Sequence, residues 1–187
     1  MRRLLPYLVA AFALLLAACG GDITRFPAPL APSGDRIGIS VSRLEVRQVS
    51  LPSYALDEEI WIEQPDGSLT ADDRLLWADE PSRGVTQELA RQLSAVSGAR
   101  VAAEPWPFED LPQARLEVRV DEFVAGANGR FRISGQFFAI SVTAGRDQAR
   151  SFAVSAPIAP DSGVPGIARA RAAAVRDLAR QVAADGF

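Results

Sequence analysis

Apolar and polar residues alternate along several stretches of the chain with the two-residue period of β-strands. Residues 37–41 alternate in this way, and a change of phase before Leu44 predicts a β-bulge near residues 42–43. Residues 114–121 alternate most regularly, which predicts a strand with one face toward water. Residues 131–143 continue as a longer strand, apolar on both faces over 137–140, as expected for the centre of a sheet.

Turn residues separate shorter strands from these long ones. The sequence Gln-Pro-Asp-Gly at 64–67 predicts a tight turn, and Gly-Ala-Asn-Gly at 126–129 predicts a hairpin turn before the long strand. Around such turns we expect further strands at 58–63, 69–77, 101–103 and 149–155.

Two segments repeat with the period of an amphipathic helix. The first runs from about residue 82 to Gly98, and its apolar face consists of Val85, Leu89, Leu93 and Val96. The second runs from about residue 165 to 184. Its buried face consists of Val175, Leu178 and Val182, and Arg169, Arg176 and Arg180 are expected toward water.

The resulting order is three strands, a helix, four strands and a second helix. This order predicts an α/β fold in which a mixed, mostly antiparallel sheet packs with two main helices as an α/β sandwich. A single domain over residues 34–187 holds all of these elements, and 48% of the chain is apolar, which is enough for a core.

The N-terminal segment has the features of a bacterial lipoprotein signal. Arg2 and Arg3 precede an apolar run over 4–18, which is shorter than the roughly 20 residues of a membrane-spanning helix. The run ends in Leu-Ala-Ala-Cys, which resembles a lipobox, and Cys19 is the sole cysteine. We therefore predict a signal peptide over 1–18 and lipidation of Cys19. The alternatives are an ordinary signal peptide or a buried helix with a cysteine there by chance.

Gly20 bears on where a lipidated protein would reside. By the usual sorting rule, aspartate after the lipidated cysteine retains a lipoprotein at the inner membrane, so glycine favours the outer membrane. Several acyl chains on Cys19 would hold the protein stably on the periplasmic face. Residues 19–33 are rich in glycine and proline, and they predict a lipidated cysteine followed by an extended tether to the periplasmic domain.

Composition excludes several classes of function. The 187 residues include no histidine and no lysine, so Ser-His-Asp and Cys-His catalysis are excluded and a serine nucleophile has no ordinary base. A formal charge of −3 argues against nucleic-acid binding. We interpret the acidic pairs at 58–59, 72–73, 79–80, 109–110 and 121–122 as solvated surface charge. We expect no enzyme activity, no cofactor and no metal site.

Several short motifs occur together in a fixed order after the lipobox. They are Leu51-Pro52-x-Tyr54, Ile60-Trp61-Ile62, Leu76-Trp77-Ala78-x-x-Pro81 and Pro105-Trp106. As a set, over residues 16–187, they resemble the PqiC family of lipoproteins, auxiliary components of ABC-type and MCE-domain intermembrane transport systems. Two departures mark a divergent member: Glu63 stands where an arginine is usual, and Arg25-Phe26-Pro27 replaces a tyrosine-rich strand.

This resemblance implies a non-catalytic docking adaptor on the outer membrane. Its partner would be an MCE-domain (PqiB-like) protein that reaches across the periplasm and carries lipids between the membranes. The resemblance also implies that copies of the chain form a homo-oligomeric ring.

Aromatic residues are the main candidates for a partner interface. Tyr54 and Trp61, with Leu51, are assigned to such an interface because tyrosine and tryptophan are enriched at interface hot spots. Core packing remains the alternative for Tyr54 and Trp61. We expect Trp77 in the core and Trp106, between two prolines, to anchor a stiff loop. The arginine face of the last helix is interpreted as solvated, and contact with lipid head groups or an acidic partner is its alternative.

Two alternative functions remain at this point. The sheet is rich in phenylalanine and valine, which permits a lipoprotein that carries one apolar ligand in its own pocket. An assembly factor for an outer-membrane complex would share the lipid anchor but not the set of motifs.

Overall fold

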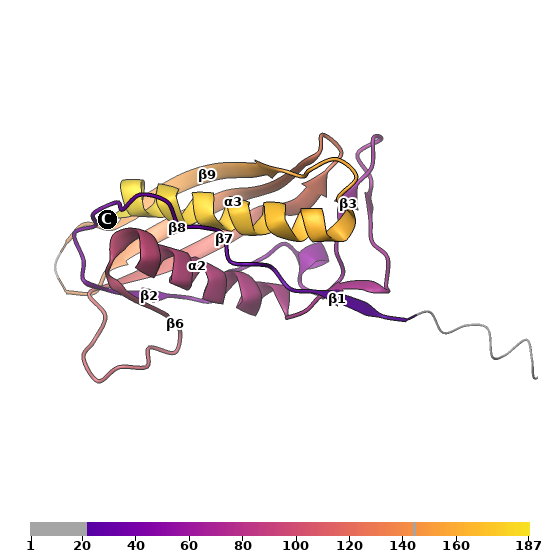
Figure 1. Cartoon of the computed structure of the whole chain (residues 1–187). Helices are drawn as coiled ribbons and strands as arrows, with labels where there is room; N and C mark the ends of the chain where they lie inside the picture. The colour runs from indigo at the N-terminus through magenta and orange to yellow at the C-terminus, as the bar shows by residue number, and fades with distance from the viewer. Residues whose placement is uncertain (1–21, 144) are drawn as a thin grey trace, which may run out of the picture.

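Two helices lie on one face of a seven-stranded mixed sheet in the computed structural model, which describes residues 22–143 and 145–187 (Figure 1). The helices are α2 (Pro81–Ser97) and α3 (Gly163–Gly186). This arrangement confirms the predicted α/β fold with a mixed sheet and two main helices.

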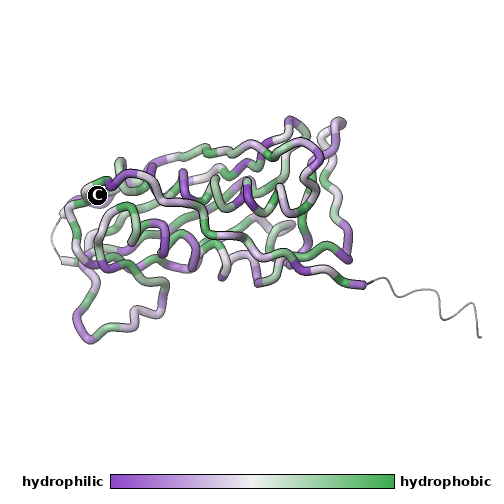
Figure 2. The backbone as a smooth tube through the Cα atoms, in the orientation of Figure 1, coloured by the Kyte–Doolittle hydropathy of each residue, from purple (hydrophilic) through white to green (hydrophobic). Residues whose placement is uncertain are grey.

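Three long antiparallel strands form the larger part of the sheet. They are β7 (Ala114–Gly126), β8 (Arg130–Ser141) and β9 (Gln148–Pro157), in that spatial order. β7 and β9 are longer than predicted, whereas β8 begins one residue before and ends two residues before its predicted bounds. The hairpin turn between β7 and β8 falls at residues 126–129 as predicted. Apolar and polar positions alternate along these strands (Figure 2).

The other edge of β7 carries short strands. Near its start β7 pairs in parallel with β2 (Arg43–Val46), which pairs in turn with β6 (Arg100–Ala103). Near its end β7 pairs with β3 (Ile62–Glu63), which is followed by β4 (Leu69–Thr70). A separate parallel pair joins β1 (Thr24–Phe26) to β5 (Leu75–Trp77).

The helices begin and end near the predicted residues, for local reasons. The side chain of Glu80 accepts hydrogen bonds from the backbone N–H groups of Ser82 and Arg83, and Pro81 occupies the first turn. Gly98 ends α2 in the left-handed conformation, with φ of 73°. On α3 the predicted residues Val175, Leu178 and Val182 are fully buried.

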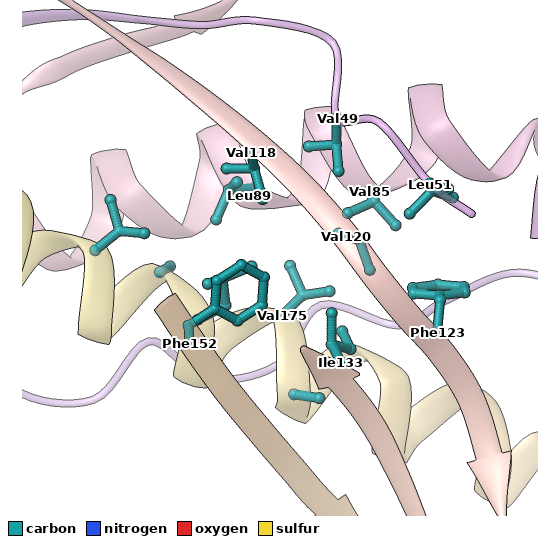
Figure 3. Close-up of a cluster of buried hydrophobic side chains, with 14 of the residues drawn as sticks. Val49, Leu51, Val85, Leu89, Val118, Val120, Phe123, Ile133, Phe152 and Val175 are labelled. Atoms are coloured by element: carbon teal, nitrogen blue, oxygen red, sulfur yellow. The ribbon is translucent and has the colours of Figure 1, made fainter. Parts of the chain in front are cut away.

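The core fills the layer between the helices and the sheet. Leu89 of α2 and Val175 of α3 meet Val118 of β7 and Ile133 of β8 there, and none of the four side chains is exposed to solvent (Figure 3). Fully burying a side chain of this size contributes about 1.5–3 kcal/mol, so each of the four stabilises the contact between helices and sheet.

A β-bulge in the middle of β7 shifts the pairing register with β8 between Val120 and Glu122. Opposite the bulge the backbones of β7 and β8 approach so closely that a Cβ on Gly135 would lie 2.1 Å from the carbonyl oxygen of Arg119. The bulge predicted near residues 42–43 is wrong, because residues 37–41 are not a strand. That segment runs past the end of α2, where the N–H of Ile37 donates to the carbonyl of Val96, and it buries only one side.

Three other sequence expectations need correction. The predicted strand over 58–63 is reduced to β3, and the one over 69–77 splits into β4 and β5 because Asp72 accepts hydrogen bonds that form a turn. The tether predicted over 19–33 is described from residue 22 onward, and there β1 pairs with β5. Further along, Gln92 and Arg180 donate to carbonyls of this segment at 2.7 and 3.1 Å, so it lies against the helices.

Candidate functional site

Tyr54 and Trp61, two of the predicted interface residues, lie together. Tyr54 belongs to a short 3₁₀ helix, η1 (Ser53–Ala55), which follows Pro52, and Trp61 directly precedes β3. Their rings pack edge to face with centroids 6.0 Å apart. The Tyr54 hydroxyl accepts a 2.9 Å hydrogen bond from the N–H of Phe123, just after the bulge. The structure therefore joins two segments that the sequence analysis could only assign separately.

The exposure of the three predicted interface residues differs. Tyr54 and Trp61 are both half-buried. Leu51 is only 6% exposed and packs in the core, so the structure places it beneath the patch and not on the surface. The indole Nε1 of Trp61 is buried and has no hydrogen-bond partner among the residues that the structure describes.

Arg132 organises a charged cluster near this pair. Its guanidinium donates to both carboxylate oxygens of Glu63, at 2.9 and 3.0 Å, and to Glu122 at 2.6 Å. The hydrogen bonds from Arg132, followed by one from the backbone of Ala127, lower the pKa of Glu63 to about 2. The same two carboxylates raise the pKa of Arg132, so the ion pair of Arg132 with Glu63 is present at physiological pH.

The sequence carries no local signal for this cluster, because its members come from three separate strands. The bulge shifts the register of β7 so that Glu122 lies opposite Ser134, which is two residues from Arg132 along β8 and therefore on the same face of the sheet. Glu63 was noted only as a departure from the family pattern. Its carboxylate occupies a structural ion pair, which gives the departure a physical role. Burial raises the pKa of Tyr54, so its hydroxyl also stays protonated.

A second charged pair lies inside the fold, between the two helices. Arg171 of α3 and Glu88 of α2 are 4% and 2% exposed, and their closest atoms are 3.4 Å apart. The Arg171 guanidinium also stacks over Trp77, with its carbon 4.8 Å from the ring centroid. Burial lowers the pKa of Arg171 and raises the pKa of Glu88. For both residues this effect of burial is larger than the opposing effect of the partner's charge.

A small cavity of about 170 Å³ adjoins this pair and is covered by Phe26, Pro27 and Ala28. Oε1 of Glu88 and Nε of Arg171 lack hydrogen-bond partners within residues 22–143 and 145–187. The spacing of Arg171 on α3 could have revealed its burial, because it continues the stripe of Val175, Leu178 and Val182 by one turn. Reading arginine as a surface residue hid that signal.

The other residues singled out in the sequence have the following positions in the structure. Trp77 lies in the core, at 3% exposed, as predicted. Trp106 is half-buried and its Nε1 donates to the carbonyl of Asp110 at 2.6 Å, as expected of a loop anchor. Arg169, Arg176 and Arg180 of α3 are exposed or half-buried. Most of the acidic pairs bind nearby arginines, as Asp72 does with Arg74.

Cys19 and the predicted signal peptide lie outside the described residues. What can be placed is the point where the chain leaves the fold: β1 lies at one end of the molecule, beside residue 74 (Figure 1). Within 22–143 and 145–187, no helix has the length and apolar character needed to cross a bilayer. The same ranges contain no group of three acidic or cysteine side chains arranged to hold a metal ion.

Comparison with known proteins gives a consistent picture. Residues 26–183 match the model of a family described as the ABC-type transport auxiliary lipoprotein component. No curated protein matches the sequence.

Solved structures share the fold at low sequence identity. The crystal structure of an uncharacterized protein has a TM-score of 0.67 and 20% identity, covering 87% of this chain and 99% of its own. A protein from Xanthomonas campestris has a TM-score of 0.69 and 16% identity, covering 86% and 93%. The PelC dodecamer from Paraburkholderia phytofirmans is less similar, with a TM-score of 0.40 and 15% identity over 89% and 100% of the two chains.

Proposed function

Because the chain belongs to the family of ABC-type transport auxiliary lipoprotein components, we propose that it is an outer-membrane-anchored docking adaptor of an intermembrane lipid transport system. The family match over residues 26–183 is the observation that carries this proposal, and it confirms the resemblance predicted from the short motifs. The family is one of transport components and not of enzymes.

The position of the N-terminal segment supports an anchored domain. β1 is tied to the body by pairing with β5, and Arg25 forms a 2.6 Å ion pair with Glu58. A lipid chain on Cys19 would lie only a few residues before this strand, since residues 20–23 span at most about 14 Å when extended. In this proposal the domain therefore lies close to the membrane, with the β1 end toward it.

The partner in this proposal is the MCE-domain subunit of the transporter, which reaches from the inner membrane. The patch of Tyr54 and Trp61, supported from below by Leu51, lies at the β1 end and is the candidate contact between neighbouring copies of the domain. A homo-oligomeric ring of such domains would repeat the contact around the partner. Sedimentation of the detergent-solubilised lipoprotein tests the ring.

Two substitutions outside the described fold test anchoring without disturbing the domain. Cys19→Ala removes the lipidation site, and Gly20→Asp keeps it while changing the sorting residue. We expect the wild-type protein in the outer-membrane fraction and crosslinked to the MCE-domain subunit. The Cys19→Ala form should be in the soluble periplasmic fraction, and the Gly20→Asp form at the inner membrane.

Two results would contradict the proposal. One is a native N-terminus in which mass analysis finds the Cys19 thiol unmodified. The other is a wild-type protein that reaches the outer membrane but does not crosslink to any MCE-domain subunit.

The alternative of a carrier with its own ligand pocket has less support. The space between helices and sheet is filled by side chains such as Leu93 and Phe137, both fully buried. A groove of about 660 Å³ between α2 and β6 lies open at the surface, and charged Arg91 and Glu104 stand in its wall beside apolar residues such as Val101. Stoichiometric lipid extracted from the purified domain would favour this alternative.

A further inference from the structure

The loop between β6 and β7, residues 104–113, holds apolar side chains in water. We call it the Trp106 loop. Leu111 is 70% exposed, more than any other large hydrophobic residue in the described parts of the chain, and Phe108 is 43% exposed. Most apolar side chains of this size in the domain are buried. Exposed apolar side chains that lie close together on a protein surface are typical of interaction sites.

The Trp106 loop is braced from within. The ring of Phe108 packs edge to face on Trp106 at 5.0 Å, and Nε1 of Trp106 donates to the carbonyl of Asp110. The guanidinium of Arg100 lies 5.0 Å from the Phe108 ring and donates to both oxygens of Asp110, at 3.0 and 3.1 Å. These contacts fix Phe108 in its exposed position.

The base of the loop is also fixed to the sheet. Nε of Arg43 donates to the carbonyl of Leu111 at 2.9 Å, and the N–H of Trp106 donates to the buried carboxylate of Glu45 at 3.2 Å. Prolines at 105, 107 and 112 restrict the backbone further. A loop ordered before binding loses little conformational entropy on binding, which favours affinity.

The location of the Trp106 loop indicates what it contacts. It protrudes at the end of the molecule opposite β1, where the chain continues toward Cys19 (Figure 1). If the β1 end faces the membrane, the Trp106 loop points away from it. Glu109 and Asp110 add negative charge to the loop, which disfavours an anionic lipid surface.

We propose that Leu111 and Phe108 of the Trp106 loop dock into an apolar groove on a protein, the transporter subunit that approaches from the opposite membrane. This inference rests on the proposed adaptor function and deepens it by naming the contact surface. The side chains act as apolar anchors, and the acidic residues of the loop, with Arg43 and Arg100 of the adjoining strands, form a polar rim around them.

Matched leucine substitutions in the full-length lipoprotein test the proposal in native membranes. Leu111→Asp introduces charge at the proposed anchor. Leu30→Asp makes the same change at a leucine that is 66% exposed and lies before the helices, outside the loop. After crosslinking, we expect Leu111→Asp to recover at least ten-fold less MCE-domain subunit than wild type, and Leu30→Asp to stay within two-fold. Amount and membrane fraction of both variants should be unchanged.

Each other outcome overturns the proposal in a distinct way. If wild type and Leu111→Asp recover the subunit equally, the loop is not the contact but the adaptor function survives. If wild type recovers none, both the adaptor function and the contact fail. If Leu111→Asp changes the sedimentation of the solubilised protein, the loop joins copies of this chain and not the transporter.

Discussion

The two ends of the molecule use aromatic and charged residues in opposite ways. At the β1 end, the Tyr54 hydroxyl accepts a hydrogen bond from the N–H of Phe123 beside the bulge, Arg132 is enclosed by two carboxylates, and Arg171 is buried over Trp77. At the other end, Arg100 and Trp106 brace a loop that keeps Leu111 in water. At the β1 end most of these polar contacts stabilise packed side chains, whereas at the other end they hold apolar side chains in an exposed position.

This difference teaches that the surfaces of the domain are not equivalent as candidates for docking. The β1 end holds the residues that resemble family motifs, yet the structure accounts for much of their chemistry through packing. In the Trp106 loop, internal contacts explain the position of Trp106, whereas no packing role explains the exposed side chain of Leu111. The predictions below separate structural roles from binding roles.

The largest expected effect lies in the buried pair of the β1 end. Glu88→Ala leaves Arg171 as an unpaired charge inside the helix layer, which should lower the free energy of unfolding by about 3–5 kcal/mol. The double variant Glu88→Leu with Arg171→Met, which removes both charges and keeps volume, should recover most of that loss. Urea denaturation of the soluble domain measures both. A double variant as unstable as Glu88→Ala would show that the charges themselves are needed.

The second-largest expected effect is a loss of stability when the close backbone contact at the bulge beside Tyr54 is disturbed. Gly135→Ala places a methyl group against the carbonyl of Arg119, so the strands must separate locally, at a cost of about 1–3 kcal/mol. The matched control is Gly129→Ala in the neighbouring turn, where an added Cβ meets no atom within 4 Å. That control carries only the strain of its positive φ. Equal loss at both positions would argue against close backbone contact at the bulge.

Tyr54→Phe separates a structural from a surface role for the Tyr54 hydroxyl. It leaves the N–H of Phe123 without its acceptor, which should reduce stability by about 1–2 kcal/mol. Hydrogen exchange provides a direct readout, because the Phe123 amide should exchange faster in the variant while amides of α3 change only with global stability. An unchanged Phe123 exchange rate would show that the hydroxyl does not hold the bulge.

The Arg132 cluster gives a pH prediction. The pKa of Glu63 is about 2 in the folded protein against 4.5 without its partners, so the folded state binds fewer protons between these values. Glu63 therefore stabilises the fold above about pH 4.5, and that contribution is lost as pH falls toward 2. Glu63→Gln should flatten the pH dependence of the urea midpoint in this window. If the urea midpoints of the wild type and of the variant changed with pH in parallel, Glu63 would not stabilise the fold through this ion pair.

How far the sequence predicts the fold depends on whether a signal is local. The two helices, β7 to β9 and the hairpin turn follow from periodicity and turn residues, and all were predicted. The bulge near 42–43 failed because alternation in 37–41 reflects one-sided burial without strand pairing. β1 was hidden in a proline-rich stretch, since its partner β5 lies about 50 residues away.

The candidate site shows the same limit. Tyr54 and Trp61 were each singled out by residue type, but their contact, and the Arg132 cluster beside them, depend on the register of β7. Arg171 carried a local signal in its helical spacing, and the assumption that arginine lies in water concealed it. Exposure of Leu111 has no sequence signal, because an apolar residue between an acid and a proline can equally be buried.

The orientation of the domain on its membrane tests the account most directly. Asp73→Cys beside β1 and Glu109→Cys in the Trp106 loop each introduce the only cysteine besides Cys19, which a lipid would block, so either can carry a nitroxide label. With the lipidated protein on vesicles containing nickel-chelating lipid, we expect strong relaxation enhancement of the label at 73 and weak enhancement at 109. Equal enhancement, or a stronger effect at 109, would contradict a domain that keeps β1 at the membrane and presents the Trp106 loop away from it.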